Sequence, residues 1–287
     1  MGVVSARSEG EVVDAVRAAR ERRRRLEIVG GGTRRGFGRP IECDDTLDLS
    51  GLSGIVGYEP EELIVTVRPG ASLAEIESAL AAKGQRLGFE PQDWRGLLGS
   101  TGTSTIGGAI SANANGPAAI RFGRARDHLL GFRAVNGVGE AYKAGGKVVK
   151  NVTGFDLPKL MCGAMGTLGP MTELTFRVFP KRAEKVFALA TEDDAILRRI
   201  AASPLEATAL IHSGGKAYVR LEGALDEKAA ILRRFGDFIE TDSLPLIPLA
   251  ETPFPPEPPA RAALTRAVKA AFDPLGLFNP GRMYEGV

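Results

Sequence analysis

Residues 100–123 read STGTSTIGGAISANANGPAAIRFG and are dense in glycine and other small residues. Glycine lets the backbone approach another group closely and tolerates positive φ. Runs of backbone N–H groups at such turns form concavities that bind anions. The stretch therefore predicts a phosphate-bearing cofactor bound largely by the main chain. A Gly/Ala-rich helix packed in the interior explains the same residues equally well, and the stretch alone does not separate the two.

A second glycine cluster precedes it. The expected strand at residues 26–29 runs directly into Gly30, Gly31, Gly32 and Thr33. This cluster does not match the dinucleotide fingerprint G-x-G-x-x-G, because Arg35 stands at the last glycine position, and it lacks the Lys-Ser/Thr ending of a nucleoside-triphosphate loop. Taken alone, it is a weak indication of phosphate binding.

A third candidate segment, residues 145–156, reads GGKVVKNVTGFD. Lys150 and Asn151 beside Gly154 could meet a phosphate or the edge of a flavin. A surface turn accounts for them equally well.

Composition excludes several classes of function. The chain has 287 residues, a net charge of +2 and 44% hydrophobic residues, so it predicts an ordinary soluble protein with no general attraction to nucleic acid. Two cysteines without metal-ligand spacing suit a reducing compartment. With no signal peptide and no membrane-spanning run expected, we predict a cytoplasmic protein, at most peripheral to the membrane through partners. Only His128 and His212 are present, which argues against zinc sites and Ser-His-Asp catalysis.

The order of expected elements divides the chain into three parts. Residues 1–180 alternate short strands, helices and glycine-rich turns. Residues 181–243 contain less glycine and read as a β-α-β-β-α layer. Residues 244–287 begin with a proline-rich connector and end in a helix at 260–272 and an ordered tail expected to dock back onto the body.

The glycine clusters occur in an order that resembles the FAD-binding domain of the vanillyl-alcohol oxidase/PCMH flavoprotein superfamily. Further stretches resemble, more narrowly, the family of FAD-binding E subunits of bacterial glycolate oxidases. These stretches are YEPEELIVTV at 58–67, KNVTGFD at 150–156, LMCGAMGTLGPMTE at 160–173 and FNPGRMY at 278–284. Residues 181–259 show little specific similarity, and this segment is shorter than the family leads us to expect.

The resemblance implies an α+β fold: a PCMH-type FAD-binding domain of two α+β subdomains, a reduced cap-like α+β layer, and a C-terminal tail that returns to the FAD domain. It implies that the first glycine cluster holds the pyrophosphate and that later segments line the rest of FAD. The cofactor-binding residues implied in this way are Gly30, Gly31, Gly32, Thr33, Thr105, Gly107, Gly108, Asn113, Gly116, Arg121, Lys150, Asn151, Met171, Thr172 and Asn279.

Three departures from the family shape the expected chemistry. Relatives that attach flavin covalently carry His or Cys in the glycine loop, and this loop has neither, so we expect non-covalent FAD. A base must take the hydroxyl proton as hydride leaves, and no residue can be nominated; His128 is the only histidine near a cofactor segment. Iron–sulfur cysteine spacing is absent, so electrons would leave through another protein.

Three hypotheses follow. In the first, the chain is the FAD-binding subunit of a glycolate oxidase complex that converts glycolate to glyoxylate. Its partners would be a larger FAD-containing subunit and an iron–sulfur subunit. In the second, it is a stand-alone FAD-dependent 2-hydroxy acid dehydrogenase. In the third, it is a structural partner that does not use FAD.

Overall fold

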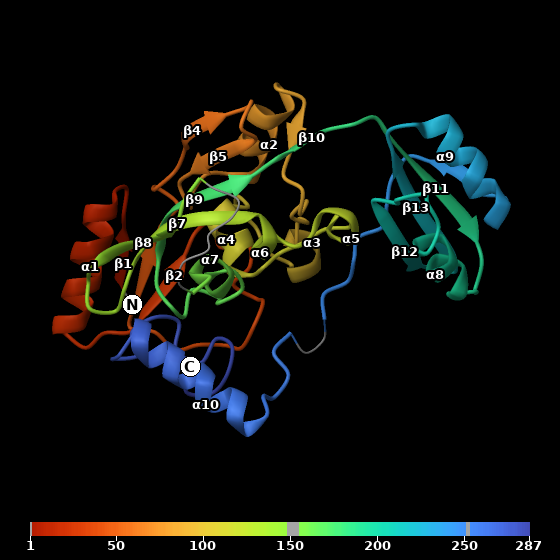
Figure 1. Ribbon diagram of the computed structural model, residues 1–287. Helices are drawn as coiled ribbons and strands as arrows, with labels where there is room; N and C mark the ends of the chain where they lie inside the picture. Colours follow the sequence, from red (N-terminus) through yellow and green to blue (C-terminus); the bar gives the residue numbers. More distant parts are fainter. Residues whose placement is uncertain (1, 148–154, 251–252) are drawn as a thin grey trace.

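A computed structural model describes residues 2–147, 155–250 and 253–287. It shows an α+β fold with two larger sheets and a two-stranded ribbon in the first 180 residues, and a third larger sheet, called the third sheet below, beyond them (Figure 1). The α+β fold expected from the sequence is therefore confirmed.

The first sheet is small and parallel, in the order β1-β3-β2. Its elements are β1 (Gly2–Ser5), α1 (Glu9–Glu21), β2 (Leu26–Val29) and β3 (Asp45–Asp48). Ser8 caps α1 by accepting a hydrogen bond from Glu11 N, and the helix buries Val12, Val16 and Ala19. The helix ends at Glu21, before the arginines at 22–25: Arg23 adopts a φ of 53°, and Arg24 donates to Asp45 Oδ1 at 2.7 Å.

The second sheet is antiparallel, in the order β4-β5-β9-β7-β8. Its strands are β4 (Ile55–Glu59), β5 (Ile64–Val67), β7 (Leu129–Val135), β8 (Ala141–Gly145) and β9 (Met171–Arg177). The helices of this region are α2 (Leu73–Ala81), α3 (Arg95–Leu98), α4 (Ile106–Ser111), α5 (Ala119–Phe122), α6 (Ala125–His128) and α7 (Leu157–Met161). Leu174 and Phe176 of β9 share one hydrophobic core with Leu80 of α2 and Ile106 and Ile110 of α4.

The stretch at 100–123 contains glycines of two kinds: one that allows close packing in the interior, and one that leaves space where a ligand could approach. A Cβ on Gly107 would lie 2.7 Å from Pro69 Cβ, so this glycine allows close packing of α4 in the interior. A Cβ on Gly108 would approach only Thr105 Oγ1, at 3.3 Å, and an arginine nitrogen at 3.8 Å, so this glycine keeps space open. The helix is six residues long, and a turn follows it at Asn113, whose φ is 46°.

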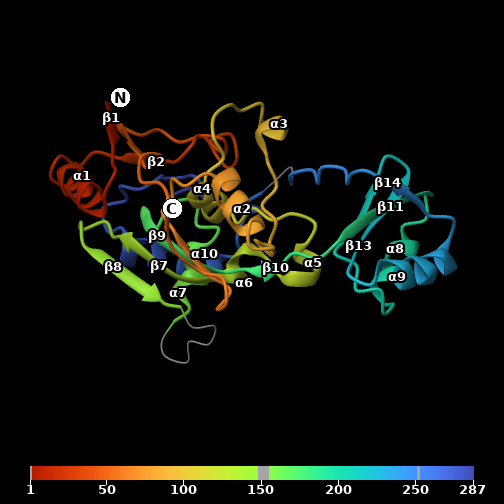
Figure 2. The same cartoon turned by 90° about the horizontal axis from the view of Figure 1, so that it is seen from above.

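The third sheet stands to one side of the body in both views (Figures 1 and 2). Its strand order is β12-β13-β11-β14, and a separate hydrophobic core that includes Phe187, Ile200 and Val219 lies beneath it. Its elements are β11 (Glu184–Ala190), α8 (Ala195–Ala201), β12 (Ala209–Ser213), β13 (Lys216–Glu222), α9 (Leu225–Leu232), a 3₁₀ turn (Arg233–Phe235) and β14 (Ile239–Thr241). The sequence predicts the order β-α-β-β-α for this part. The structure has these five elements and, in addition, the 3₁₀ turn and β14, a short edge strand.

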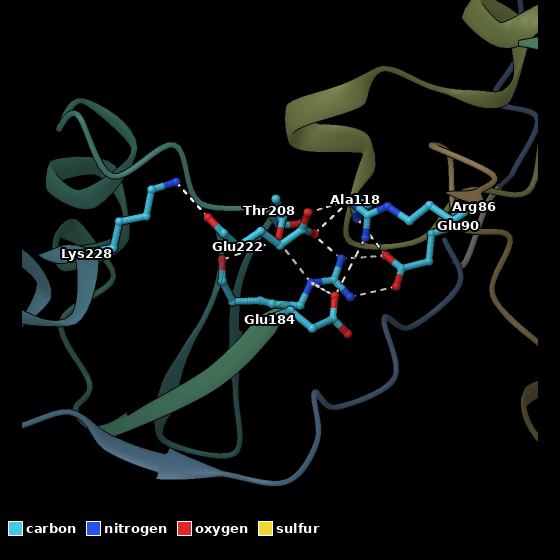
Figure 3. Close-up of polar contacts among 8 residues, drawn as sticks. Arg86, Glu90, Ala118, Glu184, Thr208, Glu222 and Lys228 are labelled. Carbon is cyan, nitrogen blue, oxygen red and sulfur yellow. Dashed lines mark hydrogen bonds and ion pairs between the residues drawn. The ribbon is translucent and has the colours of Figure 1, made fainter. Parts of the chain in front are cut away.

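The body and the third sheet are joined by a two-stranded ribbon and an ion-pair cluster. β6 (Gln85–Arg86) pairs with β10 (Phe179–Pro180) where the chain leaves the body. Beside it, Arg220 of β13 makes a bidentate pair with Glu90 of the body, at 2.6 and 2.7 Å (Figure 3). Conversely, Arg86 of β6, in the body, donates to Glu222 Oε2 of β13, in the third sheet, at 2.8 Å.

The C-terminal segment returns to the body, where α10 (Pro259–Phe272) packs against the core of the antiparallel sheet through Val268 and Phe272. Lys269 is 5% exposed, and its Nζ donates to Asp273 Oδ2 at 2.7 Å, to Thr167 O at 2.6 Å and to Phe278 O at 2.8 Å. Asp273 in turn accepts hydrogen bonds from the backbone N–H groups of Leu277 and Phe278. This buried pair therefore fixes the tail to the loop that precedes β9.

Candidate FAD site

A cavity lies where the end of β2, the start of α4, the loop before β9 and the C-terminal tail meet. The space between these segments is about 760 Å³ when the part that is open to solvent is included. Its lining residues are Glu27, Ile28, Val29, Gly30, Gly31, Gly32, Thr33, Arg34, Arg35, Leu49, Pro69, Thr105, Gly107, Gly108, Ser111, Ala112, Met165, Gly166, Gly169, Met171, Asn279 and Arg282.

The glycine loop after β2 forms one wall of this cavity. A Cβ on Gly31 would lie 1.6 Å from Thr103 O, and one on Gly30 would lie 2.6 Å from Thr105 Oγ1. These two glycines allow the loop to approach the segment before α4 closely. Gly32 differs from them, because its φ is 73° and a Cβ there would contact only Arg35 Cδ, at 3.8 Å. Gly32 therefore turns the backbone beside open space.

The tail closes the cavity through Asn279, which is 3% exposed and has a φ of 41°. Its Oδ1 accepts from Ile28 N at 2.8 Å, and its Nδ2 donates to Met165 O at 2.6 Å. The side chain thus joins β2 to the loop before β9. Both amide ends are occupied within the protein, so Asn279 shapes the wall of the cavity.

Charged side chains in the wall are a feature that the sequence analysis missed. Glu27 is 5% exposed and lies between Arg35 and Arg282, whose Nη2 is 3.1 Å from Glu27 Oε1. Burial lowers the pKa of Arg282, and the nearby charge of Glu27 partly opposes this effect. With Arg34 included, the wall carries three arginines and one glutamate, a net charge of +2. The alternation of Glu27 with hydrophobic residues in β2 is the signal that could have pointed to Glu27.

The structure brings nine of the expected cofactor residues together in this cavity. They are Gly30, Gly31, Gly32, Thr33, Thr105, Gly107, Gly108, Met171 and Asn279. Asn113, Gly116, Arg121 and Thr172 are not among its lining residues. Lys150 and Asn151 lie outside the described residues.

Each of the four residues outside the lining has a contact of its own. A Cβ on Gly116 would lie 2.1 Å from Glu90 O, so this glycine allows close packing of two loops. Arg121 pairs with Glu206 of the third sheet's layer at 2.5 Å. Thr172 Oγ1 donates to Glu9 Oε2 at 2.6 Å. The amide of Asn113 accepts from the Cys162 thiol at 3.5 Å.

Comparison with known proteins identifies the family. A family model described as FAD binding domain (FAD_binding_4) matches residues 1–145, half of the chain. The chain belongs to this FAD-binding family. FAD is accordingly the cofactor of this domain.

Two relatives of known name are subunits of an oxidoreductase. "Glycolate oxidase subunit GlcE" of Escherichia coli is 36% identical over 202 residues, which cover 69% of this chain and 56% of that protein. "Glycolate oxidase subunit GlcD" of Bacillus subtilis is 32% identical over 189 residues, covering 66% of this chain and 39% of that protein. The chain thus spans about half the length of these relatives or less.

The fold is also found in a solved structure of alkyldihydroxyacetonephosphate synthase. That structure superposes with a TM-score of 0.65 over 81% of this chain and 49% of the other. Since the two sequences are 18% identical, the similarity is one of fold.

The uncovered backbone and the charge of this cavity suit FAD, the cofactor of the family. Gly32 and Gly108 leave backbone uncovered on two sides of the cavity, where a flat or phosphate-bearing group can approach. The net charge of +2 in the wall matches the two negative charges of a pyrophosphate. Bound FAD supplies hydride chemistry, while the protein binds and orients it.

Neither cysteine of the chain lines the cavity, and neither is suited to covalent attachment of flavin. Burial raises the pKa of the Cys43 thiol to about 11 and that of the Cys162 thiol to about 12, so both are protonated at neutral pH. Because the thiolate is the nucleophile, neither side chain is activated to attack the flavin ring.

We therefore expect that acid precipitation of the FAD-loaded protein releases all of its flavin into the supernatant. The measurement is the flavin absorbance of supernatant and pellet after centrifugation. Yellow colour that stays with the precipitated protein after washing would contradict non-covalent binding.

Neither histidine lies in the wall of the cavity. His128 is 1% exposed and packs between Phe89 and Phe179, and burial lowers its pKa. His212 lies on β12, with Nε2 2.8 Å from Thr191 O. Glu27 is the only carboxylate among the described lining residues, and two arginines occupy it. The described wall thus presents no free general base.

Proposed function

We propose that this chain is the FAD-binding subunit of a glycolate oxidase complex, in which glycolate is oxidised to glyoxylate. The observation that carries the proposal is the 36% identity to "Glycolate oxidase subunit GlcE", which extends over 202 residues. On this proposal, a second flavoprotein subunit and an iron–sulfur subunit complete the complex.

The composition of the cavity supports a division of labour between subunits. Oxidation of a 2-hydroxy acid needs a base for the hydroxyl proton, and the described wall offers only a glutamate held between two arginines. The residues that line the cavity are suited to binding and orienting FAD. The proton-accepting group would then belong to a partner subunit.

The complex would associate with a membrane, if at all, through its other members. None of the helices in residues 2–147, 155–250 and 253–287 has the length and apolar character needed to cross a bilayer. Location in the cytoplasm, at the inner membrane or away from it, is part of the proposal.

The test is a visible absorbance spectrum of the FAD-loaded chain, recorded without oxygen before and after glycolate is added. We expect the flavin bands to persist with the chain alone and to bleach once the partner subunits are added. Bleaching by glycolate with the chain alone would contradict the subunit proposal and indicate a stand-alone 2-hydroxy acid dehydrogenase. Failure to take up FAD at all would indicate a structural partner.

A further inference from the structure

Arg34 differs from the other charged residues of the cavity wall in having no carboxylate partner. It is 7% exposed, and no carboxylate oxygen of the described chain lies within 4.0 Å of its guanidinium. Arg35 and Arg282, in contrast, share the buried carboxylate of Glu27. Within the described part of the chain, the positive charge of Arg34 is therefore not neutralised by an ion pair.

The contacts that Arg34 does make are to neutral groups. Nη1 donates to Ser104 Oγ at 2.8 Å and to Thr33 Oγ1 at 3.4 Å, and Nη2 donates to Gln92 O at 3.2 Å. Nε is buried and has no hydrogen-bond partner among the described residues. Burial lowers the pKa of Arg34 to about 10, and the charge of Asp93 opposes this effect only in part. The guanidinium therefore remains charged at neutral pH in a place where burying an unpaired charge is costly.

The surroundings of the guanidinium keep space free beside it. Arg34 follows directly on the glycine loop and lines the same cavity as Gly32 and Gly108. A Cβ on Gly108 would lie 3.8 Å from Arg34 Nη1, so the absence of a side chain there leaves the guanidinium uncovered on that side. An anion bound between Gly32 and Gly108 would meet both backbone and guanidinium.

We propose that Arg34 pairs with the pyrophosphate of bound FAD and thereby makes the site select phosphorylated flavin over riboflavin. An arginine presents two parallel N–H groups to phosphate oxygens, and such charge-assisted hydrogen bonds are stronger than neutral ones. The inference rests on FAD as the cofactor and is independent of which substrate is oxidised.

If Arg34 had a purely structural role, its replacement would change flavin binding in a different way. The guanidinium also lies over the ring of Trp94, 5.2 Å from the ring centroid, and bonds to the 92–104 segment. If these contacts were its whole purpose, loss of Arg34 would weaken binding of FAD and riboflavin alike.

The experiment compares dissociation constants of FAD and riboflavin, measured by quenching of flavin fluorescence, for the unmodified chain and for Arg34→Met. We expect FAD to bind about 10- to 100-fold more weakly to the variant, with riboflavin changed less than about twofold. Arg34→Lys, which keeps the charge but loses the two parallel N–H groups, should recover only part of the FAD affinity. Arg22→Met, which removes an exposed arginine at the end of α1, is the matched control and should change neither constant.

Two results would overturn the proposal: FAD affinity of Arg34→Met equal to that of the unmodified chain, or equal losses for FAD and riboflavin. Thermal unfolding without flavin checks that the variant is folded. If Arg34→Met does not fold, inorganic pyrophosphate serves as the probe on the unmodified chain. It should compete with FAD and leave riboflavin binding unchanged, and absence of competition would overturn the proposal. Failure of the unmodified chain to bind FAD would instead overturn the cofactor assignment itself.

Discussion

Replacing Gly31 with alanine is expected to abolish FAD binding and to lower the free energy of unfolding by about 3 kcal/mol, the upper part of the range for overpacking a filled site. The added Cβ would lie 1.6 Å from Thr103 O and 2.8 Å from Thr103 C. Both are backbone atoms, so no side chain can rotate away to make room. The glycine loop and the segment before α4 would have to separate, and these segments form two walls of the cavity.

The effect of Gly31→Ala is measured by urea unfolding of the flavin-free protein and by FAD titration. Gly96→Ala is the matched control, because Gly96 lies in helix α3 and a Cβ there would have no neighbour within 4 Å. In a helix interior, alanine is favoured over glycine by about 0.5–1 kcal/mol, so this control should be neutral or slightly stabilising. Undiminished FAD binding by Gly31→Ala would show that the loop is not held against the 103–105 segment as described.

Replacing Arg220 with methionine is expected to cost about 3 kcal/mol and to loosen the third sheet from the body. The substitution removes the ion pair of Glu90, whereas Arg86 still pairs with Glu184 and Glu222. Lys228, the other cation labelled in Figure 3, donates to the backbone oxygen of Glu222. Breaking a buried pair by removing one partner typically costs 3–5 kcal/mol. We take the low end because the side chain of Glu90 is 36% exposed.

The effect of Arg220→Met is measured as the change in the free energy of unfolding by urea and as the rate of proteolysis in the connection at residues 181–183. Arg199→Met serves as the control, because this arginine is 61% exposed and its pair with Asp193 is on the surface. Equal stabilities and equal cleavage rates of Arg220→Met and the unmodified chain would contradict the assigned role of the cluster.

The contribution of this pair should depend on pH in a defined direction. Burial alone would raise the pKa of Glu90, but the hydrogen bonds and charge of Arg220 outweigh it and hold the pKa below its usual value of 4.5. A carboxyl whose pKa is lowered by folding stabilises the protein fully above its unfolded pKa and loses this contribution as the pH falls through the folded pKa. The difference in stability between the unmodified chain and Arg220→Met should therefore shrink below about pH 4.5.

Much of the fold could be predicted because local signals and packing agree. Ser72 caps α2 by accepting from Glu75 N, and a serine followed three residues later by a glutamate is a signal that the sequence itself carries. β5 is rich in β-branched residues, and its side chains are buried on both faces. Other features depend on distant residues: beyond the end of α1, Arg24 pairs with Asp45, 21 positions away.

The glycine residues that line the candidate site could be predicted from the sequence, but its charged residues could not. Gly30, Gly31 and Gly107 stand out in the sequence because the backbone must come close to another segment. Arg34 and Arg35 read as ordinary charged residues of a loop. Their importance depends on burial and on the positions of Glu27 and Arg282, the latter almost at the other end of the chain. Sequence spacing carries no information about such a charge balance.

Glycine also serves purposes other than cofactor contact, and this explains the residues that the structure leaves outside the cavity. Gly116 stands in the same glycine-rich stretch as Gly108, but it is required by the approach of Glu90 O. The two positions look alike in the sequence. Only the neighbours brought in by the fold distinguish a glycine that packs from one that leaves room for a ligand.

The most direct test of FAD binding in this cavity is a crystal structure of the chain grown with FAD. We expect density for one flavin between the glycine loop, α4 and the C-terminal tail, with the pyrophosphate against residues 30–34. Flavin bound elsewhere, or a cavity without flavin in protein that is saturated with FAD, would contradict the assignment.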